Sequence, residues 1–435
     1  MSAHQQQQHL APAPSGTFSA LRQRQFALLW CSGVGQSIGL GMQQITLGHF
    51  VYDRTDSELW VGAVAFMNFA PFFLFSPVAG VIGDRTDRRN LLFIAQAISG
   101  LAVLTLAILI TTDLVAMWQV LLIALAAATG QALTVPTRLA YVNDLVEPRF
   151  LMNAVALNSL AQNGMRIIGP VLAGVLIAVA GSGGTMYANA AGYLLGLIPL
   201  AMLQSRPRPP ATHTAVLRNI AEGIHFAAKT PMVFFVIMMG NIFSLFGMPY
   251  ISMLPVFAED VLGKGAAGLG LLSSASGAGA VVGGILLARW GDVRDKRRLF
   301  QACFILFFGA LFLFSLSPIY GLSLALLVLV GIGSMSNINV GTVMLQIGTP
   351  RELQSRTMSL WTWGISLSFL GALPIGALAE VYGAPVVMAG SALIGLLCGA
   401  LLMLWYAAYT RRTASVTSAL QANPAPATAE QRPSP

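Results

Sequence analysis

The chain has 435 residues, of which 56% are hydrophobic and only 9% are Asp, Glu, Lys or Arg. Soluble domains carry roughly 25% of such charged residues, so this chain has too little charge to cover a surface that faces water. The net charge of +8 therefore indicates membrane topology and contact with anionic lipid headgroups, and we expect no binding of nucleic acid.

Uncharged tracts predict twelve membrane-spanning helices. In chain order, single spans are expected at 25–52, 59–83, 90–112, 114–137, 230–258, 265–288, 357–379 and 381–410. Two longer tracts each hold two spans: 150–205, which turns back at Gly181 to Gly184, and 299–350, which turns back near Ser317 and Pro318. Each span is near or above the roughly 20 residues that cross a bilayer. Lipid offers the backbone no hydrogen bonds, so spans of this length are predicted to be helices.

The spans and basic residues predict the organisation of the chain and its orientation. We expect a disordered tail over 1–20, a six-helix bundle over 21–204, a connector with an amphipathic helix over 205–230, a second six-helix bundle over 231–410 and a disordered tail over 411–435. Nearly all Lys and Arg residues, Arg138 among them, fall on one side; Arg54 and Lys264 fall on the other, and Arg166 lies within a span. The positive-inside rule therefore places both termini in the cytoplasm.

A short charged string, D-x-x-D-[KR]-R, occurs once in each half and follows a glycine both times. The first copy comprises Gly80, Gly83, Asp84, Arg85, Asp87, Arg88 and Arg89, and the second comprises Gly291, Asp292, Asp295, Lys296 and Arg297. Duplicated halves are typical of transporters that rock around a shared site near the middle of the membrane. Acids three residues apart at a helix end can pair with basic residues in a partly dry interface that opening would break, so both copies are predicted to control gating.

Residues 80–89 resemble the loop signature of the major facilitator superfamily, usually written G-x-L-a-D-r-x-G-r-[KR], with Asp87 at the eighth position where glycine is usual. The resemblance covers essentially the whole chain. It implies an all-α membrane fold of twelve helices in two pseudo-symmetric halves, and a motif that locks the outward-facing state.

Three further segments, 51–57, 153–170 and 254–258, look like the exporter branch that includes the enterobactin exporter and macrolide efflux proteins. That resemblance implies an exporter in a bacterial inner membrane, and we expect it to be monomeric, in contact with membrane lipid and without a cofactor. The implied substrate is a small amphipathic molecule such as a siderophore or an antibiotic, and the implied energy source is proton antiport. An importer or lysophospholipid transporter of the same fold stays open, because sequence does not give the direction of transport.

In the fifth span, Gly169, Pro170 and Gly174 are similar to the antiporter motif G-P-x-x-G-G, with Ala173 where glycine is usual. Glycine and proline bend a membrane helix and let a neighbour approach closely. The alternative is ordinary close packing, since both residues are common in membrane helices.

Arg166 lies near the middle of that span, and no acid lies at the same depth in any span. A guanidinium there needs a partner, which is either a set of carbonyls, polar side chains and water or an anionic substrate. Other polar or aromatic residues at similar depth are candidates for substrate contact, although amides also simply join neighbouring helices. They are Gln43, Asn68, Gln131, Asn163, Asn241, Asn337, Asn339, Trp361 and Trp363.

Proton-coupled drug exporters of the resembled superfamily commonly carry an acid in span 1 and an arginine in span 4. Span 1 here offers Gln36 and Gln43 instead, and span 4 has no arginine before Thr137. The remaining candidates for proton coupling lie at the rims of spans: His49, Asp53 and Glu380. The five histidines form no H-E-x-x-H pattern and no nucleophile elbow occurs, so we expect neither an enzyme nor a metal site.

Overall fold

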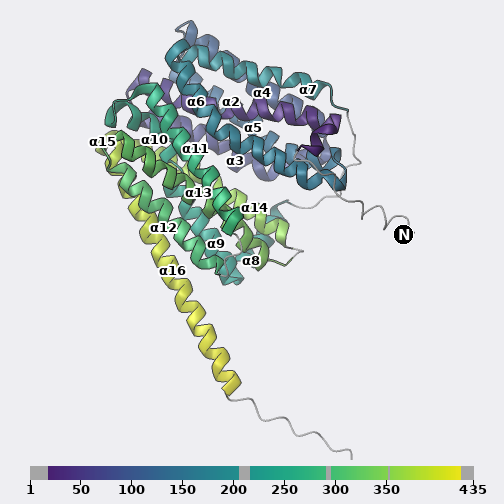
Figure 1. Ribbon diagram of the computed structural model, residues 1–435, viewed down its shortest axis with the longest axis vertical. Helices are drawn as coiled ribbons and strands as arrows, with labels where there is room; N and C mark the ends of the chain where they lie inside the picture. Colours follow the sequence, from purple (N-terminus) through teal and green to yellow (C-terminus); the bar gives the residue numbers. More distant parts are fainter. Residues whose placement is uncertain (1–17, 205–215, 291–294, 351–352, 423–435) are drawn as a thin grey trace, which may run out of the picture.

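The structure is a computed structural model that describes residues 18–204, 216–290, 295–350 and 353–422. Helix is the only regular secondary structure in these ranges (Figure 1). The helices, with η2 a 3-10 turn and η3 and η4 π-helical, are η2 (Ser19–Arg22), α2 (Arg24–Thr55), α3 (Glu58–Arg85), α4 (Arg88–Thr111), α5 (Met117–Leu145), α6 (Pro148–Leu195), α7 (Leu197–Ala201), α8 (Val216–Lys229), α9 (Pro231–Ile242), η3 (Phe243–Gly247), α10 (Tyr250–Val256), η4 (Phe257–Val261), α11 (Gly265–Trp290), α12 (Lys296–Ser315), α13 (Tyr320–Gly348), α14 (Gln354–Ile365), α15 (Ser368–Tyr382) and α16 (Ala384–Ala422).

Ten helical stretches of the described chain are long and apolar enough to cross a membrane. Helix α2 is also of spanning length but more polar, because it buries Gln36 and Gln43. Helix α6 holds two spans, since its backbone turns at Gly181, where φ is 70° and ψ is 178°. Glycine adopts such a positive φ without a steric penalty. Counting α2 and both parts of α6 gives the twelve spans that the uncharged tracts predict.

The helices pack into two groups joined by α8. In the N-half, helices α2–α7, α2 packs along α6, and α4 lies against α5 and α6. In the C-half, helices α9–α16, α13 packs against α11 and α12, and α16 lies against α12. Figure 1 shows the two halves diverging from one shared end, with the last part of α16 extending beyond the bundle. This is the all-α, two-half membrane fold expected from the sequence. The residue boundaries assigned to the two bundles stay predictions.

Two pairs of glycines bring the halves together at the shared end, which we call the closed end. A methyl group on Gly62 of α3 would lie 3.0 Å from Cα of Gly376 on α15. A methyl group on Gly174 of α6 would likewise lie 3.0 Å from Cα of Gly270 on α11. Any larger residue would force the helices apart, so the absence of side chains lets the two halves meet backbone to backbone.

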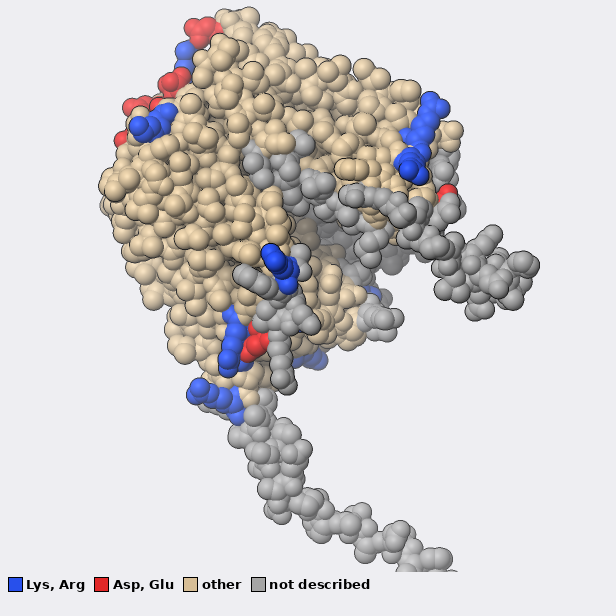
Figure 2. Space-filling view, viewed as in Figure 1, with Lys and Arg blue, Asp and Glu red and all other residues tan. Residues whose placement is uncertain are grey.

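The opposite end, which we call the open end, carries the N-terminus of α2, the α3–α4 turn and α8. Figure 2 shows the surface hollowed between the two halves on this side. Acidic residues gather at the closed end in the same view, whereas Lys and Arg dominate elsewhere. The fold therefore presents a hollow between the halves at the open end, and direct contacts between the halves at the acidic, closed end.

Candidate functional site

The first copy of the charged string connects three helices of the N-half at the open end. Arg88 Nη1 lies 2.5 Å from Asp144 Oδ2 of α5 and donates to the carbonyl oxygen of Ala140 at 2.9 Å. Only 11% of the Arg88 side chain and 14% of the Asp144 side chain are exposed. The pair is therefore partly dry, which strengthens its attraction relative to a pair on the surface.

Asp87 and Arg89 fix helix ends. The Asp87 carboxylate accepts a hydrogen bond from the backbone N–H of Arg89 at 2.9 Å and so caps α4. Arg89 donates to the carbonyl oxygens of Leu200 at 3.2 Å and Ala201 at 2.6 Å, where a cation also favours the negative end of α7. The acid that pairs with Arg88 is Asp144, which the sequence pattern did not single out, whereas Asp87 caps a helix.

The ion pair made by the second copy is more exposed than that of Arg88 with Asp144. Asp295 caps α12 by accepting from the backbone N–H of Arg298 at 3.0 Å, and the Arg298 Nε lies 2.9 Å from its Oδ2. The Arg298 side chain is 80% exposed. Arg297 lies over the Tyr406 ring at 5.9 Å from its centroid, and Lys296 begins α12. Residues 80–85 are described only as the backbone of α3, and Gly291 and Asp292 lie outside the described parts, so the gating role of Gly80, Gly83, Asp84, Arg85, Gly291 and Asp292 stays a prediction.

Arg138 is buried inside the N-half, whereas the basic-residue pattern assigned it to the membrane surface. Helix α5 runs past Thr137 to Leu145, which places Arg138 within the fourth span. Its guanidinium donates to the carbonyl oxygen of Leu29 at 2.8 Å, Oε1 of Gln36 at 2.8 Å and Oε1 of Gln96 at 3.3 Å. The expectation that span 4 lacks an arginine is therefore wrong. Neutral oxygens, and no carboxylate among the described side chains, solvate this charge.

Gln43 and Gln131, two candidates for substrate contact, meet in the core of the N-half. Gln131 Nε2 donates to Gln43 Oε1 at 3.3 Å and to the Tyr193 hydroxyl at 3.0 Å, and that hydroxyl lies 3.4 Å from Gln43 Oε1. Gln43 is 4% exposed, Gln131 3% and Tyr193 0%. These amides join α2, α5 and α6 and do not face the hollow in this conformation.

The candidates for substrate contact in the C-half differ in burial. Asn337 is fully buried, and Trp361 is buried against Gly240 and Gly341. Asn241 packs beside Gly364, and Asn339 is half-buried on α13. Of this set, Asn241 and Asn339 keep partial exposure.

The contact between the halves at mid-depth is aromatic. The rings of Phe73 on α3 and Trp363 on α14 stack with centroids 4.7 Å apart, and Trp363 Nε1 donates to the carbonyl oxygen of Phe73 at 3.1 Å. Phe369 lies 5.1 Å from the Phe66 ring and 5.2 Å from the Phe73 ring. Asn68 lies on the same helix, half-buried, with its Nδ2 on the carbonyl oxygen of Val64. Trp363 is thus a candidate for substrate contact that joins the two halves.

The side chains of Asn163 and Arg166 lie outside the described part, although the backbone of Arg166 is midway along the first part of α6. Gly169 approaches Cα of Gly41 on α2, where a methyl group would lie 2.9 Å away. Gly174 makes the glycine contact with α11 described above, and Pro170 lies inside α6. These contacts fit the close-approach interpretation of the G-P-x-x-G-G resemblance, and hinge motion stays a prediction.

Polar contacts cross between the halves at the closed end. His49 Nδ1 lies 3.2 Å from Glu259 Oε1, and the Tyr52 hydroxyl donates to Asp260 Oδ2. Glu380 Oε2 accepts from the Ser57 hydroxyl at 2.7 Å and from the Leu59 backbone N–H at 3.1 Å. Asp53 is exposed beside this group. Two proton-coupling candidates, His49 and Glu380, thus join the halves, and Glu259 and Asp260 are partners that the sequence pattern missed.

Known proteins match this chain over most of its length. Residues 15–432 match the family described as transmembrane secretion effector. The enterobactin exporter EntS of Shigella boydii serotype 18 is 26% identical over 369 residues, covering 84% of this chain and 88% of that protein, and EntS of Escherichia coli O157:H7 gives the same values.

Solved structures show the same fold at low identity. A bacterial homologue of the human lysosomal transporter Spinster, inward-facing and unoccupied, superposes with a TM-score of 0.70 at 14% identity, covering 89% of this chain and 97% of that one. A variant of the peptide transporter POT gives 0.74 at 14% identity, covering 93% and 98%.

Proposed function

Because the chain belongs to the transmembrane secretion effector family of the major facilitator superfamily, we propose that it exports a small amphipathic molecule, such as a siderophore or an antibiotic, by alternating access driven by protons. The enterobactin exporters of similar sequence support export as the direction. The closed end and the hollow at the other end support alternating access, since one end of such a transporter closes while the other opens.

The observation that carries this proposal is the aromatic contact between the halves. Phe66, Phe73, Trp363 and Phe369 bring flat, polarizable faces to mid-depth, where α3 meets α14 and α15. The Trp363 indole N–H and the Asn68 amide add polar groups beside those rings. Apolar walls with a few polar groups are typical of small-molecule sites, and they suit a substrate that has both an aromatic and a polar part.

In this proposal the open end faces the cytoplasm of a bacterial inner membrane, with both termini there, and the connector helix α8 contacts lipid headgroups. The basic residues at the open end and the acidic residues at the closed end support that orientation. Cysteine labelling from outside the cell tests it: residues introduced at Leu114 or Ile319 should react, and residues introduced at Arg298 should not.

The function is tested by metabolite profiling of cells and medium, with and without the protein, under iron limitation and antibiotic challenge. Export predicts that at least one amphipathic compound accumulates in the medium, and that Trp363→Ala lowers this at least tenfold. Trp118→Ala is the matched control, because Trp118 is 61% exposed on α5 and far along the sequence from the aromatic contact. Depletion of a compound from the medium would instead identify an importer.

A further inference from the structure

Three carboxylates of the C-half meet three donors of the N-half at the closed end. Glu259 and Asp260 lie on η4, opposite His49 and Tyr52 of α2. Glu380, near the end of α15, meets Ser57 before α3. His49 is the only one of the three donor side chains whose charge changes between about pH 5 and pH 8.

The geometry of the His49 contact makes it sensitive to that charge. Nδ1 lies 3.2 Å from Glu259 Oε1, but it is buried and makes no hydrogen bond among the described atoms. The attraction across the halves therefore depends on charge rather than on an aligned N–H. A protonated imidazole forms an ion pair there, whereas a neutral imidazole leaves a carboxylate beside a buried nitrogen that does not bind it.

We propose that His49 and Glu259 form a proton-binding site that latches the closed end of the transporter when the imidazole is protonated. The proposal rests on the alternating-access function proposed above, and it identifies where an external proton acts on that cycle. When the closed end opens, the two residues separate with their halves and His49 becomes free to exchange its proton with the solvent on that side.

Other charged groups lie at the closed end on the elements that carry the pair and on their neighbours. The acids are Asp260 on η4, Glu58 on α3, Glu380 on α15, Asp53 on α2 itself and Asp56 directly after it, and the bases are Arg54 on α2 and Lys264 before α11. Arg54 is held by Asp113 at 2.8 Å, and Lys264 lies over the Tyr320 ring at 5.8 Å. Protonation of the imidazole adds a positive charge beside the Glu259 carboxylate, so mild acid closes this end and alkaline pH loosens it.

The other two contacts limit the size of the effect. The Tyr52 hydroxyl donates to Asp260, and Ser57 with the Leu59 N–H donates to Glu380, whether or not His49 is charged. Loss of the imidazole charge therefore weakens the attraction between the halves at the closed end but leaves these other contacts in place. Partly exposed ion pairs give about a threefold change in such an equilibrium.

The test measures the closed-to-open ratio as a function of pH, without any transported substrate. Spin labels are attached to cysteines introduced at Leu114 in the α4–α5 loop and Ile319 before α13, after Cys31, Cys303 and Cys398 are replaced by serine. Leu114 is 71% exposed and Ile319 61%. Electron–electron distance measurements in nanodiscs then resolve the closed and open populations. We expect the ratio to fall about threefold between pH 6 and pH 8.

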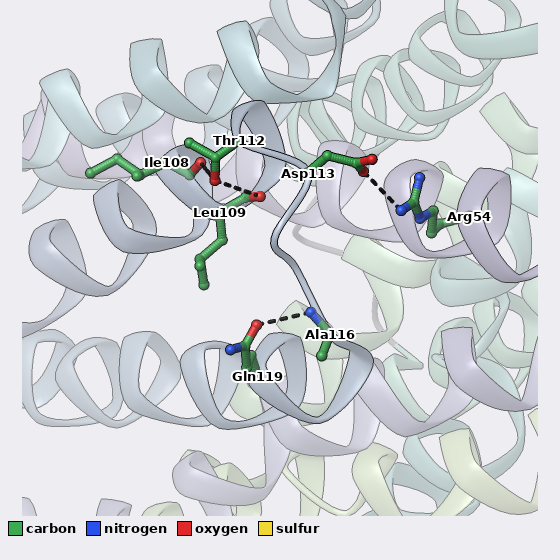
Figure 3. Close-up of polar contacts among 7 residues, drawn as sticks. All are labelled: Arg54, Ile108, Leu109, Thr112, Asp113, Ala116 and Gln119. Atoms are coloured by element: carbon green, nitrogen blue, oxygen red, sulfur yellow. Dashed lines mark hydrogen bonds and ion pairs between the residues drawn. The ribbon is translucent and has the colours of Figure 1, made fainter.

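Variants of the pair make the test specific. His49→Gln and Glu259→Gln should both remove the pH dependence, and His49→Lys, which keeps a positive charge at pH 8, should hold the ratio at its pH 6 value. Arg54→Gln is the matched control. Figure 3 shows that Arg54 pairs with Asp113 in the α4–α5 loop, so this exposed ion pair stays within the N-half and the variant should leave the pH dependence intact.

The possible outcomes separate the two proposals. A single distance population at every pH would contradict alternating access itself. Two populations whose ratio does not change with pH, or changes equally in His49→Gln, would overturn the latch and leave the transport function standing. Thermal melting of each variant checks folding, and the charge-retaining His49→Lys keeps the test decisive if the glutamine variants melt early.

Discussion

The two halves share one fold but fill their cores with different chemistry. The N-half buries a hydrogen-bonded network around Arg138, in which Gln96 also accepts from the Ser32 hydroxyl at 3.1 Å and donates to the Tyr193 carbonyl oxygen at 2.8 Å. The C-half buries aromatic rings of α12 instead: Phe300, Phe304, Phe307, Phe308 and Phe314, none more than 1% exposed. The symmetry of the backbone therefore does not extend to the interactions that stabilise each half.

This difference follows from what stabilises helices in lipid. Apolar side chains gain little by leaving lipid for another helix, so association depends on close packing and on hydrogen bonds between helices. The C-half relies on packing, since its rings interlock with centroids 4.5 to 6.2 Å apart around Phe307. The N-half relies on hydrogen bonds, which are directional and fix one arrangement of α2, α4 and α5. Three variants test this contrast.

The largest effect is expected in the aromatic core. Phe307→Ala removes a fully buried ring that touches Phe243 and Phe308, and leaves a cavity that the surrounding helices cannot fill. We expect a loss of about 4 kcal/mol in the free energy of unfolding, seen as a lower melting temperature in detergent. Leu313→Ala on the same helix, 55% exposed to lipid, should change it by less than about 0.5 kcal/mol.

The two copies of the charged string should also differ. Arg88→Gln leaves Asp144 mostly buried without this cation, so we expect a loss of about 3 kcal/mol. Lys296→Gln at the corresponding position of the second copy should cost less than about 0.5 kcal/mol, because the contacts of that copy are exposed. Equal losses in the free energy of unfolding would show that both copies stabilise the fold equally, which would contradict this prediction.

A smaller effect is expected in the hydrogen-bonded core. Gln96→Leu keeps the side-chain volume but leaves the Ser32 hydroxyl, one Arg138 donor and the Tyr193 carbonyl oxygen without their partner. The expected loss is about 2 kcal/mol, because each buried polar group keeps its desolvation penalty. Gln44→Leu on α2 is the control, since Gln44 is exposed. A melting temperature unchanged by Gln96→Leu would show that the network does not stabilise the N-half.

The sequence predicted the positions of the helices better than the contacts between them. The turn at Gly181 and the loop between α12 and α13 could be predicted from the sequence, because uncharged tracts have to fit the thickness of a bilayer. Arg138 was misplaced for the same reason. A charge was taken as the end of a span, whereas Gln36 and Gln96 on two other helices solvate it within the bundle.

Contacts across the halves were also beyond the sequence pattern. Glu259 directly follows the predicted span 230–258, and nothing in one chain shows that His49, far away in the sequence, lies beside it. Asp144 escaped notice because the acids expected to pair with Arg88 belonged to its own motif, and Asp87 serves as a helix cap instead. In each case the missing information was which helices are neighbours in space.

The glycine pairs at the closed end have a consequence for the ion gradients across the membrane. Gly62 against Gly376, and Gly174 against Gly270, bring the backbones of the two halves into direct contact. A passage must accommodate an ion and its water or replace that water with polar groups, and backbones in direct contact do neither. At these two contacts an ion therefore finds no path between the halves, which helps the membrane keep its electrical and chemical gradients.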